Sequence, residues 1–280
     1  MIIWIASYPK SGNTWVRSFL TAYYFCENGI FDINKLNLIE DYPNKQFFKE
    51  KVKQGEIHKH WETSQKDICN QKKVKFLKTH NSLITAFGND FTKPEYTLGV
   101  IYVIRDPRNV ITSVKNHNDL DSYDEALKFM QDENKVLEDY PHLKNYAKTN
   151  IVNSWRINYR SWLSNKSFRR VTIRYEDMVK NPTQTFEKLV VFVNTLMRFD
   201  NKIDQKKLNN AIDTTNFKSL QNIENAGKFG ENVYSLKDNR KIKFFYQGPE
   251  NDWKKNLDEN MIKKMNEYYQ NDLKFFQYEN

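Results

Sequence analysis

The sequence predicts a single α/β domain in which helices flank a central parallel sheet. Short apolar runs rich in β-branched and aromatic residues alternate with stretches whose apolar residues recur every three or four positions. The runs that we interpret as buried strands are Ile2 to Ala6, Val74 to Leu77, Gly99 to Ile104 and Val171 to Arg174. Strands that alternate with amphipathic helices are typical of a parallel sheet covered by helices.

Helical spacing supports this interpretation between the strands. Apolar residues follow the helical period over 16–23, after the first strand, and over 152–162, before the last. Asn181 followed by Pro182 predicts the start of a further helix, because Asn favours the N-cap and Pro the first turn. Predicted helices therefore alternate with predicted strands along the chain.

The whole chain, residues 1–280, is predicted to form one domain. No repeat and no compositionally simple linker divides its 280 residues. Two polar stretches, at about 31–73 and 118–150, are longer than ordinary connections between a strand and a helix. We expect these two stretches to form helical excursions or lids that carry ligand specificity.

Composition limits the class of protein. Hydrophobic residues make up 39% and aromatic residues 15% of the chain, which is enough for a sizeable core. The 44 Lys and Arg against 35 Asp and Glu leave a net charge of +9, which favours anionic partners such as nucleotides, nucleic acid, sulfated sugars or a membrane surface. Charge alone does not choose among them.

The cysteines and the N-terminus indicate a cytoplasmic protein. Cys26 and Cys69 are too few for a disulfide framework, so we expect reduced thiols. The apolar run at Ile2 to Ala6 is followed by Lys10 and is shorter than a signal-peptide core or a membrane span. We therefore expect no membrane span.

The segment Ser7 to Trp15 has the properties of a phosphate-binding loop. It lies between the first predicted strand and the first predicted helix, where open α/β sheets bind ligands. Gly12 lets backbone N–H groups approach an anion, the helix start adds the positive end of its dipole, and Lys10 adds a full charge. Ser11 and Thr14 add hydroxyl donors. The loop is not a Walker motif, because Lys10 precedes Gly12 and the first Gly of that motif is absent.

This loop resembles the 5′-phosphosulfate loop of cytosolic sulfotransferases. The similar stretch reads Tyr8-Pro9-Lys10-Ser11-Gly12-Asn13-Thr14-Trp15, with Asn13 in place of the usual first Thr. The resemblance implies a P-loop-like nucleotide-binding fold and 3′-phosphoadenosine-5′-phosphosulfate (PAPS) as co-substrate, with the desulfated nucleotide PAP as product. It also implies co-substrate contacts for Lys10, Ser11, Gly12, Asn13, Thr14 and Trp15, the last by stacking on the base.

A second motif follows the third predicted strand. Arg105, with Pro107 two residues later and Ser113 eight residues later, resembles the 3′-phosphate signature of the same family. Arg suits a terminal phosphate because its planar fork donates two parallel hydrogen bonds. A surface ion pair between Arg105 and Asp106 would be the preferred interpretation of this motif if it stood alone.

The rest of the nucleotide pocket is implied by weaker resemblances. Those segments place Tyr175, Thr215, Phe217, Phe245 and Gly248 around the nucleotide. The chain departs from the family at the two basic residues before that glycine, where it has Tyr246 and Gln247. Part of the usual charge near the 3′-phosphate is therefore missing. We expect Arg105 and Ser113 to carry a larger share of its recognition, unless Arg240, Lys241 or Lys243 compensates.

The catalytic centre is implied by Lys78-Thr79-His80, which follows the second predicted strand. It is similar to the family segment in which His is the general base and Lys holds the transferring group. A histidine with a pKa of about 6.5 stays mostly neutral and basic near pH 7. Lys10 would stabilise the leaving phosphate. The expected reaction is in-line transfer of a sulfuryl group to a hydroxyl or amine of a small-molecule or glycan acceptor.

The remaining histidines indicate no metal site. His58 and His60 form a two-ligand pattern without a third partner, and His117 and His142 stand in polar helical or loop surroundings, where they are less promising. We expect no metal in the reaction.

Two other functions remain open from the sequence. An atypical nucleoside or sugar kinase would also need a phosphate cradle and a base, although the Walker pattern is absent. A basic nucleic-acid-binding protein would account for the net charge of +9 and the many aromatics, but no compact basic tract with interleaved aromatics supports it, so we expect no nucleic-acid partner. The sequence indicates neither the acceptor nor the oligomeric state.

Overall fold

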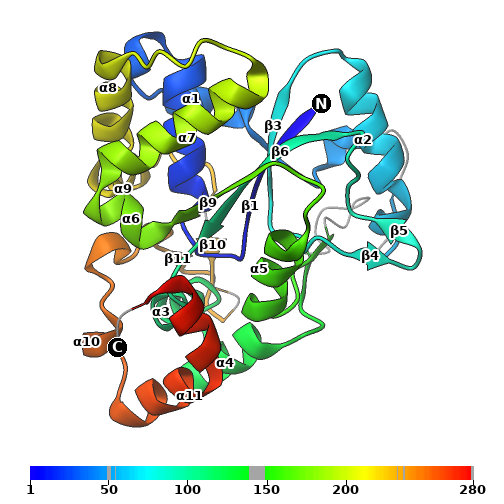
Figure 1. The fold of residues 1–280 in the computed structure, drawn as a ribbon. Helices are drawn as coiled ribbons and strands as arrows, with labels where there is room; N and C mark the ends of the chain where they lie inside the picture. Colours follow the sequence, from blue (N-terminus) through cyan, green and yellow to red (C-terminus); the bar gives the residue numbers. More distant parts are fainter. Residues whose placement is uncertain (49–51, 54, 139–148, 232, 236, 279–280) are drawn as a thin grey trace.

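A five-stranded parallel sheet forms the centre of the molecule (Figure 1). The computed structural model describes residues 1–48, 52–53, 55–138, 149–231, 233–235 and 237–278. The strands stand in the order β2-β3-β1-β6-β9, and each neighbouring pair is parallel. Their bounds are β1 Ile2–Ser7, β2 Glu40–Asp41, β3 Lys75–Thr79, β6 Thr97–Ile104 and β9 Arg170–Arg174. The predicted α/β class and parallel sheet are confirmed, and all four predicted strands are present.

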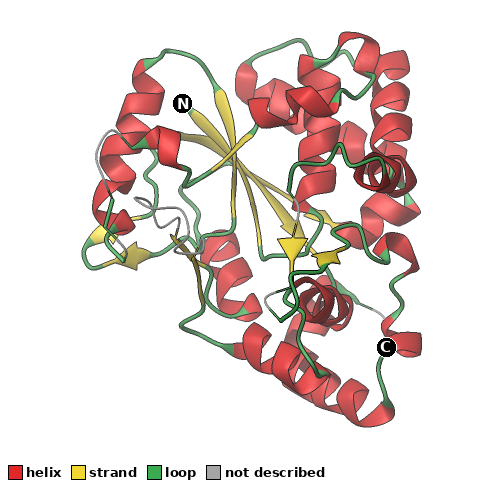
Figure 2. Ribbon diagram, turned by 180° about the vertical axis from the view of Figure 1, so that it is seen from behind, coloured by secondary structure: helices red, strands yellow, loops and turns green. Residues whose placement is uncertain are grey.

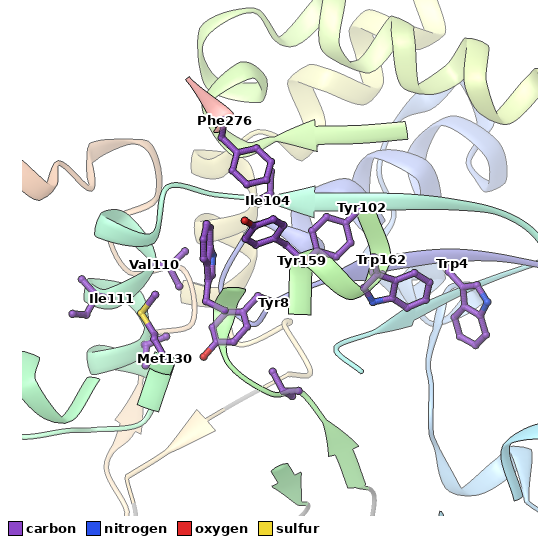
Figure 3. Close-up of a cluster of buried hydrophobic side chains, with 14 of the residues drawn as sticks. Trp4, Tyr8, Tyr102, Ile104, Val110, Ile111, Met130, Tyr159, Trp162 and Phe276 are labelled. Atoms are coloured by element: carbon purple, nitrogen blue, oxygen red, sulfur yellow. The ribbon is translucent and has the colours of Figure 1, made fainter. Parts of the chain in front are cut away.

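Both faces of the sheet are buried, as the nearly continuous apolar runs of its central strands require. In β1, Trp4 and its alternate neighbours join one hydrophobic cluster, whereas Ile3 and Ile5 join the other. In β6, Tyr102 faces the first cluster and Ile101 the second. Figure 3 shows the first cluster, in which Trp4, Tyr102 and Trp162 lie along the sheet.

Helices cover the two faces in separate groups (Figure 1). One group packs on the cluster that contains Ile3: α1 Asn13–Phe25, α6 Tyr175–Lys180, α7 Pro182–Met197, α8 Gln205–Thr215 and α9 Phe217–Asn225. The other group packs on the cluster that contains Trp4: α2 Trp61–Asn70, α3 Pro107–His117, α4 Tyr123–Gln131, α5 Trp155–Ser164, α10 Trp253–Asn256 and α11 Glu259–Phe276. Figure 2 shows from behind that the sheet runs between the two groups.

Smaller elements complete the described part of the chain. Three antiparallel pairs join β4 Thr85–Ala86 to β5 Asn89–Asp90, β7 Val136–Glu138 to β8 Thr149–Ile151, and β10 Val233–Tyr234 to β11 Lys241–Ile242. Single 3-10 turns lie at Glu27–Gly29, Ile33–Leu38, Lys45–Phe47, Ile57–His60 and Gly248–Glu250.

The two predicted excursions contain strands as well as helices. The first, 31–73, holds α2 and contributes β2, an edge strand of the main sheet. The sequence did not predict β2, because two acidic residues carry no apolar strand pattern. The second, 118–150, holds α4 and the β7–β8 pair. Residues 49–51, 54 and 139–148, which include His142, lie outside the described residues.

Within the described ranges, every helix is too short or too polar to cross a membrane. Both cysteines, Cys26 and Cys69, are unpaired, which fits the expected reduced thiols.

Candidate active site

The carboxyl ends of all five strands meet at a cavity of about 900 Å³. Parallel strands all point their carboxyl ends to the same edge of the sheet, so residues far apart in sequence converge there. Each strand supplies cavity-lining residues at or just after its end: Lys10 after β1, Asp41 from β2, Lys78 and His80 from β3, Arg105 after β6 and Tyr175 after β9.

The loop after β1 has a backbone that few residues adopt. Gly12 has φ 101°, and a Cβ atom there would lie 2.6 Å from the Tyr175 ring. Lys10 also has a positive φ of 66°, which is uncommon for a residue with a side chain and is found at ligand-binding turns. The side-chain amide of Asn13 donates to Ile5 O (3.0 Å) and to Ser7 Oγ (3.1 Å). These bonds tie the loop to the end of β1.

His80 is oriented by the neighbouring strand. Its Nδ1 donates to Ser7 O at 2.8 Å, and the backbone oxygen of His80 accepts from the Asn158 amide at 3.0 Å. Because Ala6 and Thr79 are paired in the sheet, Ser7 and His80 are the next residues to meet. The hydrogen bond fixes the proton of the neutral ring on Nδ1, so Nε2 is the basic nitrogen.

Lys10 lies between two rings. Its Nζ is 3.2 Å from His117 Nδ1 and 4.0 Å from the centre of the Phe244 ring. Burial lowers the pKa of Lys10 to about 7, and the positive charges of Lys78 and Arg105 add to this effect against the opposing charge of Glu231. Lys10 therefore titrates near neutral pH in the unliganded protein.

His117 is a cavity residue that the sequence analysis set aside. It ends helix α3 among polar neighbours, as expected, but it also lines the cavity and contacts Lys10, so it is closer to the site than the sequence indicated. Burial lowers the pKa of His117 well below its usual value, and the charges of Lys10, His80 and Lys78 lower it further. The signal for its position was present in the sequence, because His117 follows Ser113 by four residues and so shares its helical face.

Two carboxylates offset the clustered cations. Lys78 Nζ is 3.2 Å from Asp41 Oδ2, and Arg17 Nη1 is 2.5 Å from Glu231 Oε1. Burial alone would raise the pKa of Glu231, but Arg17 and Lys78 lower it to about 2. Sequence reasoning missed Asp41, Arg17 and Glu231, which become neighbours only through the tertiary fold.

Arg105 is directed at the cavity. It is 4% exposed, donates from Nη2 to Gly248 O (2.8 Å) and from Nη1 to Ser113 Oγ (3.4 Å), and lies 3.9 Å from the centre of the Tyr175 ring. Asp106 pairs with Arg108 at 2.8 Å. The ion pair considered for Arg105 and Asp106 is therefore replaced by one between Asp106 and Arg108.

Gly248 lies in close contact with the predicted adenine side of the pocket. It has φ 55°, and a Cβ atom there would lie 2.2 Å from the Phe217 ring. The rings of Trp15 and Tyr175 meet edge to face with centres 5.6 Å apart. Cavity-lining residues among the predicted nucleotide contacts are Lys10, Gly12, Asn13, Thr14, Trp15, Arg105, Ser113, Tyr175, Phe217, Phe245 and Gly248.

Two predicted contact residues do not line the cavity. Ser11 is fully buried, and its hydroxyl has no hydrogen-bond partner in the described part of the chain. Thr215 is also buried, and its hydroxyl donates to Ala211 O at 2.6 Å within the same helix. Both hydroxyls lie behind the cavity surface.

The two positions that depart from the family pattern lie at the cavity without charge. Tyr246 and Gln247 both line it, and Gln247 exchanges hydrogen bonds with Asn256. Arg240 pairs with Asp119 and Asp238. Arg240, Lys241 and Lys243 are exposed and are not among the cavity-lining residues.

Across the ranges that the structure describes, no group of three or more His, Cys, Asp or Glu side chains could hold a metal ion.

The sequence pattern of a known protein family matches almost the whole chain. The family described as "Sulfotransferase domain" matches residues 2–277. The chain belongs to the sulfotransferase family. It is therefore an enzyme of the PAPS-dependent sulfotransferase class, which favours sulfuryl transfer over the kinase alternative.

Curated relatives of this sulfotransferase are similar along nearly its whole length. It is 25% identical to "Sulfotransferase 1 family member D1" of Mus musculus over 275 residues, which cover 95% of this chain and 81% of the relative. It is 26% identical to "Sulfotransferase 1E1" of Homo sapiens over 286 residues, which cover 96% and 83%. It is 21% identical to "Amine sulfotransferase" of Oryctolagus cuniculus, with coverage of 98% and 81%.

Solved structures share the fold of this sulfotransferase. Retinol dehydratase in complex with retinol and PAP matches with a TM-score of 0.61 and 16% identity, over 98% of this chain and 81% of that one. Mouse sulfotransferase SULT7A1 complexed with PAP matches with a TM-score of 0.55 and 15% identity, over 97% and 84%. At such identities the likeness shows the fold alone.

Proposed function

We propose that this sulfotransferase transfers the sulfuryl group of PAPS to a hydroxyl or amine, with His80 as general base and Lys10 and Lys78 as the cations around the transferring group. The observation that carries the proposal is the convergence of the Lys10 loop, His80 and Arg105 on one cavity. Retinol dehydratase and mouse SULT7A1, which share the fold, are both complexes with PAP. We further propose the cytoplasm as its location, in keeping with two unpaired cysteines.

The charges of the site suggest an orientation for the nucleotide. The 3′-phosphate would lie on Arg105 and Ser113, since these side chains already contact each other at 3.4 Å. The 5′-phosphosulfate would lie in the loop of Lys10 to Thr14, at the start of α1. The adenine would fit among Trp15, Tyr175 and Phe217, which offer flat apolar faces.

The proposed chemistry is a single displacement at sulfur. The acceptor oxygen or nitrogen forms a bond to sulfur while the bond from sulfur to the 5′-phosphate oxygen breaks. The acceptor proton goes to Nε2 of His80, and the electron pair of the broken bond stays on the phosphate of PAP. Lys10 would donate to that leaving oxygen, and a fixed charge in a site poor in water is effective there.

The first test of the proposed function is selective stabilisation by PAP. At one hundred times its Kd, PAP should stabilise the folded protein by about 2.7 kcal/mol, because it binds only the folded state. The melting temperature should rise by several degrees, and ATP should raise it much less because it lacks the 3′-phosphate. Differential scanning fluorimetry measures both shifts. Equal shifts from PAP and ATP, or none from either, would reject the proposed function.

The titration of Lys10 predicts how PAP affinity depends on pH. Lys10 is charged below its pKa of about 7 and neutral above it, and bound phosphate favours the charged form. PAP binding should therefore weaken between pH 7 and 9, by up to about tenfold per pH unit. The charge of PAP changes little in this range, because the second pKa of a phosphate monoester is near 6.

Variants at position 10 separate this effect from other titrations. In Lys10→Met, calorimetric affinity for PAP should be lower and nearly independent of pH between 7 and 9. In Lys10→Arg, the affinity should also lose its pH dependence but stay high, because guanidinium remains charged. A pH slope in Lys10→Met as steep as in the wild type would assign the titration to another group.

A further inference from the structure

The part of the cavity beyond the nucleotide loop is lined by a set of residues that we call the acceptor wall. It consists of Asn116, His117, Asn118, Phe129, Leu137 and Asn150. Three of these residues follow one another at the end of α3, and the others come from α4, β7 and β8. Asn116, His117, Asn118 and Asn150 give this wall polar side chains that can hydrogen-bond to an acceptor, and Asp119, Lys135 and Glu138 line the same end of the cavity and add charge.

Asn150 offers a hydrogen-bond donor beside the proposed base. It is 6% exposed, and its Oδ1 accepts from the Asn81 amide at 3.1 Å. Asn81 directly follows His80, and its own Oδ1 accepts from Ile151 N at 2.8 Å, so Asn150 is held next to the catalytic segment. The Nδ2 atom of Asn150 has no hydrogen-bond partner among the described residues and is not among the fully enclosed polar atoms. The open side of this amide is therefore the cavity.

The end of α3 offers hydrogen-bond acceptors. The amide nitrogen of Asn116 donates to Lys243 O at 3.0 Å, and that of Asn118 donates to Val114 O at 3.0 Å. In both side chains, the protein therefore binds the amide nitrogen and leaves the amide oxygen for other partners. Within the described part of the chain, both Oδ1 atoms accept no hydrogen bond and are not enclosed.

Three carboxylates line this end of the cavity, those of Asp41, Asp119 and Glu138, and each already has an interaction partner. Asp41 pairs with Lys78. Asp119 accepts from Ser235 Oγ at 2.5 Å and from Arg240 at 3.2 Å. A cationic acceptor would have to break one of these interactions, whereas a neutral acceptor leaves them intact.

Donors and acceptors placed around one space favour hydroxyl groups, because each hydroxyl donates one hydrogen bond and accepts others. Phe129 and Leu137 add apolar surface for the C–H face of a ring. We propose that the acceptor is a neutral polyhydroxylated molecule of the sugar or glycoside class, whose hydroxyls contact Asn150, Asn116 and Asn118. This inference rests on the proposed function, since it names the acceptor of the same reaction.

The experiment compares acceptors that share one aromatic group. Labelled PAPS is offered to the wild-type protein with 4-nitrophenol and with the 4-nitrophenyl β-glycosides of glucose, galactose, mannose and N-acetylglucosamine. At least one glycoside should be sulfated on its sugar with kcat/KM at least tenfold above that for 4-nitrophenol. Sulfation of 4-nitrophenol alone, or of none of these acceptors by a protein that binds PAP, overturns the acceptor class. A protein that does not bind PAP overturns the proposed function instead.

A variant of Asn150 tests the contact itself. Asn150→Asp keeps an oxygen for the Asn81 amide but replaces the donor that faces the cavity. The KM for the glycoside should rise about five- to a hundredfold, while the Kd for PAP stays within twofold. Asn89→Asp, in the exposed β4–β5 turn, is the matched control and should change neither value.

Asn118→Ala should also raise the KM for the glycoside, because it removes a hydrogen-bond acceptor from the cavity. Unchanged KM in both cavity variants overturns the proposed contacts.

Discussion

Replacing His80 with Asn should lower turnover about a hundred- to ten-thousandfold, the usual contribution of a positioned general base. Asn retains an N–H that can donate to Ser7 O, where His80 now donates at 2.8 Å, but it has no basic nitrogen. The affinity for PAP should stay within twofold of the wild type, because the proposed base contacts the acceptor. Steady-state transfer from labelled PAPS measures the first effect and calorimetry measures the second.

The control for this variant is a histidine outside the cavity. His60 packs edge to face on Phe48 with ring centres 6.3 Å apart, and it is not a cavity-lining residue. His60→Asn should retain wild-type turnover. If His80→Asn also retains it, His80 is not the base, and His117, the second imidazole at the cavity, becomes the candidate to test.

Local signals predicted the parts of the site that lie at the ends of apolar strands. The strands that precede Lys10, His80 and Arg105 are recognisable as short apolar runs with β-branched or aromatic residues. Once the sheet is parallel, its carboxyl ends must meet. A motif does not specify which way each side chain points, however, and Ser11 and Thr215 lie behind the cavity surface.

Residues brought in by tertiary packing could not be predicted in this way. Glu231 reaches Arg17 across more than two hundred residues of sequence, and no local pattern marks either as part of a site. Asp41 ends a strand of only two acidic residues, whose place in the sheet depends on pairing with β3. His117 was predictable in principle from its helical spacing to Ser113, but only if the helix was known to continue to its last turn.

We expect 3′-phosphate recognition to depend mainly on Arg105, because Tyr246 and Gln247 are uncharged. Gln247 is occupied by Asn256, and Arg240 is occupied by Asp119 and Asp238 while 59% of its side chain is exposed. Arg105 is the buried cation whose guanidinium already contacts Ser113 and Gly248. A buried guanidinium interacts with a phosphate more strongly than an exposed one, because solvent screens it less.

Arg105→Gln should therefore reduce the preference for PAP over adenosine 5′-monophosphate, which lacks the 3′-phosphate, by about ten- to a hundredfold. This range corresponds to the loss of one hydrogen bond between charged groups, about 1.5 to 3 kcal/mol. The glutamine amide retains an N–H that can reach Gly248 O, so the pocket keeps its shape while the charge is removed. Calorimetric Kd values for both nucleotides give the preference. Arg240→Gln removes an exposed cation that does not line the cavity and should leave that preference unchanged. A preference that survives in Arg105→Gln and is lost in Arg240→Gln would move 3′-phosphate recognition to the C-terminal basic residues.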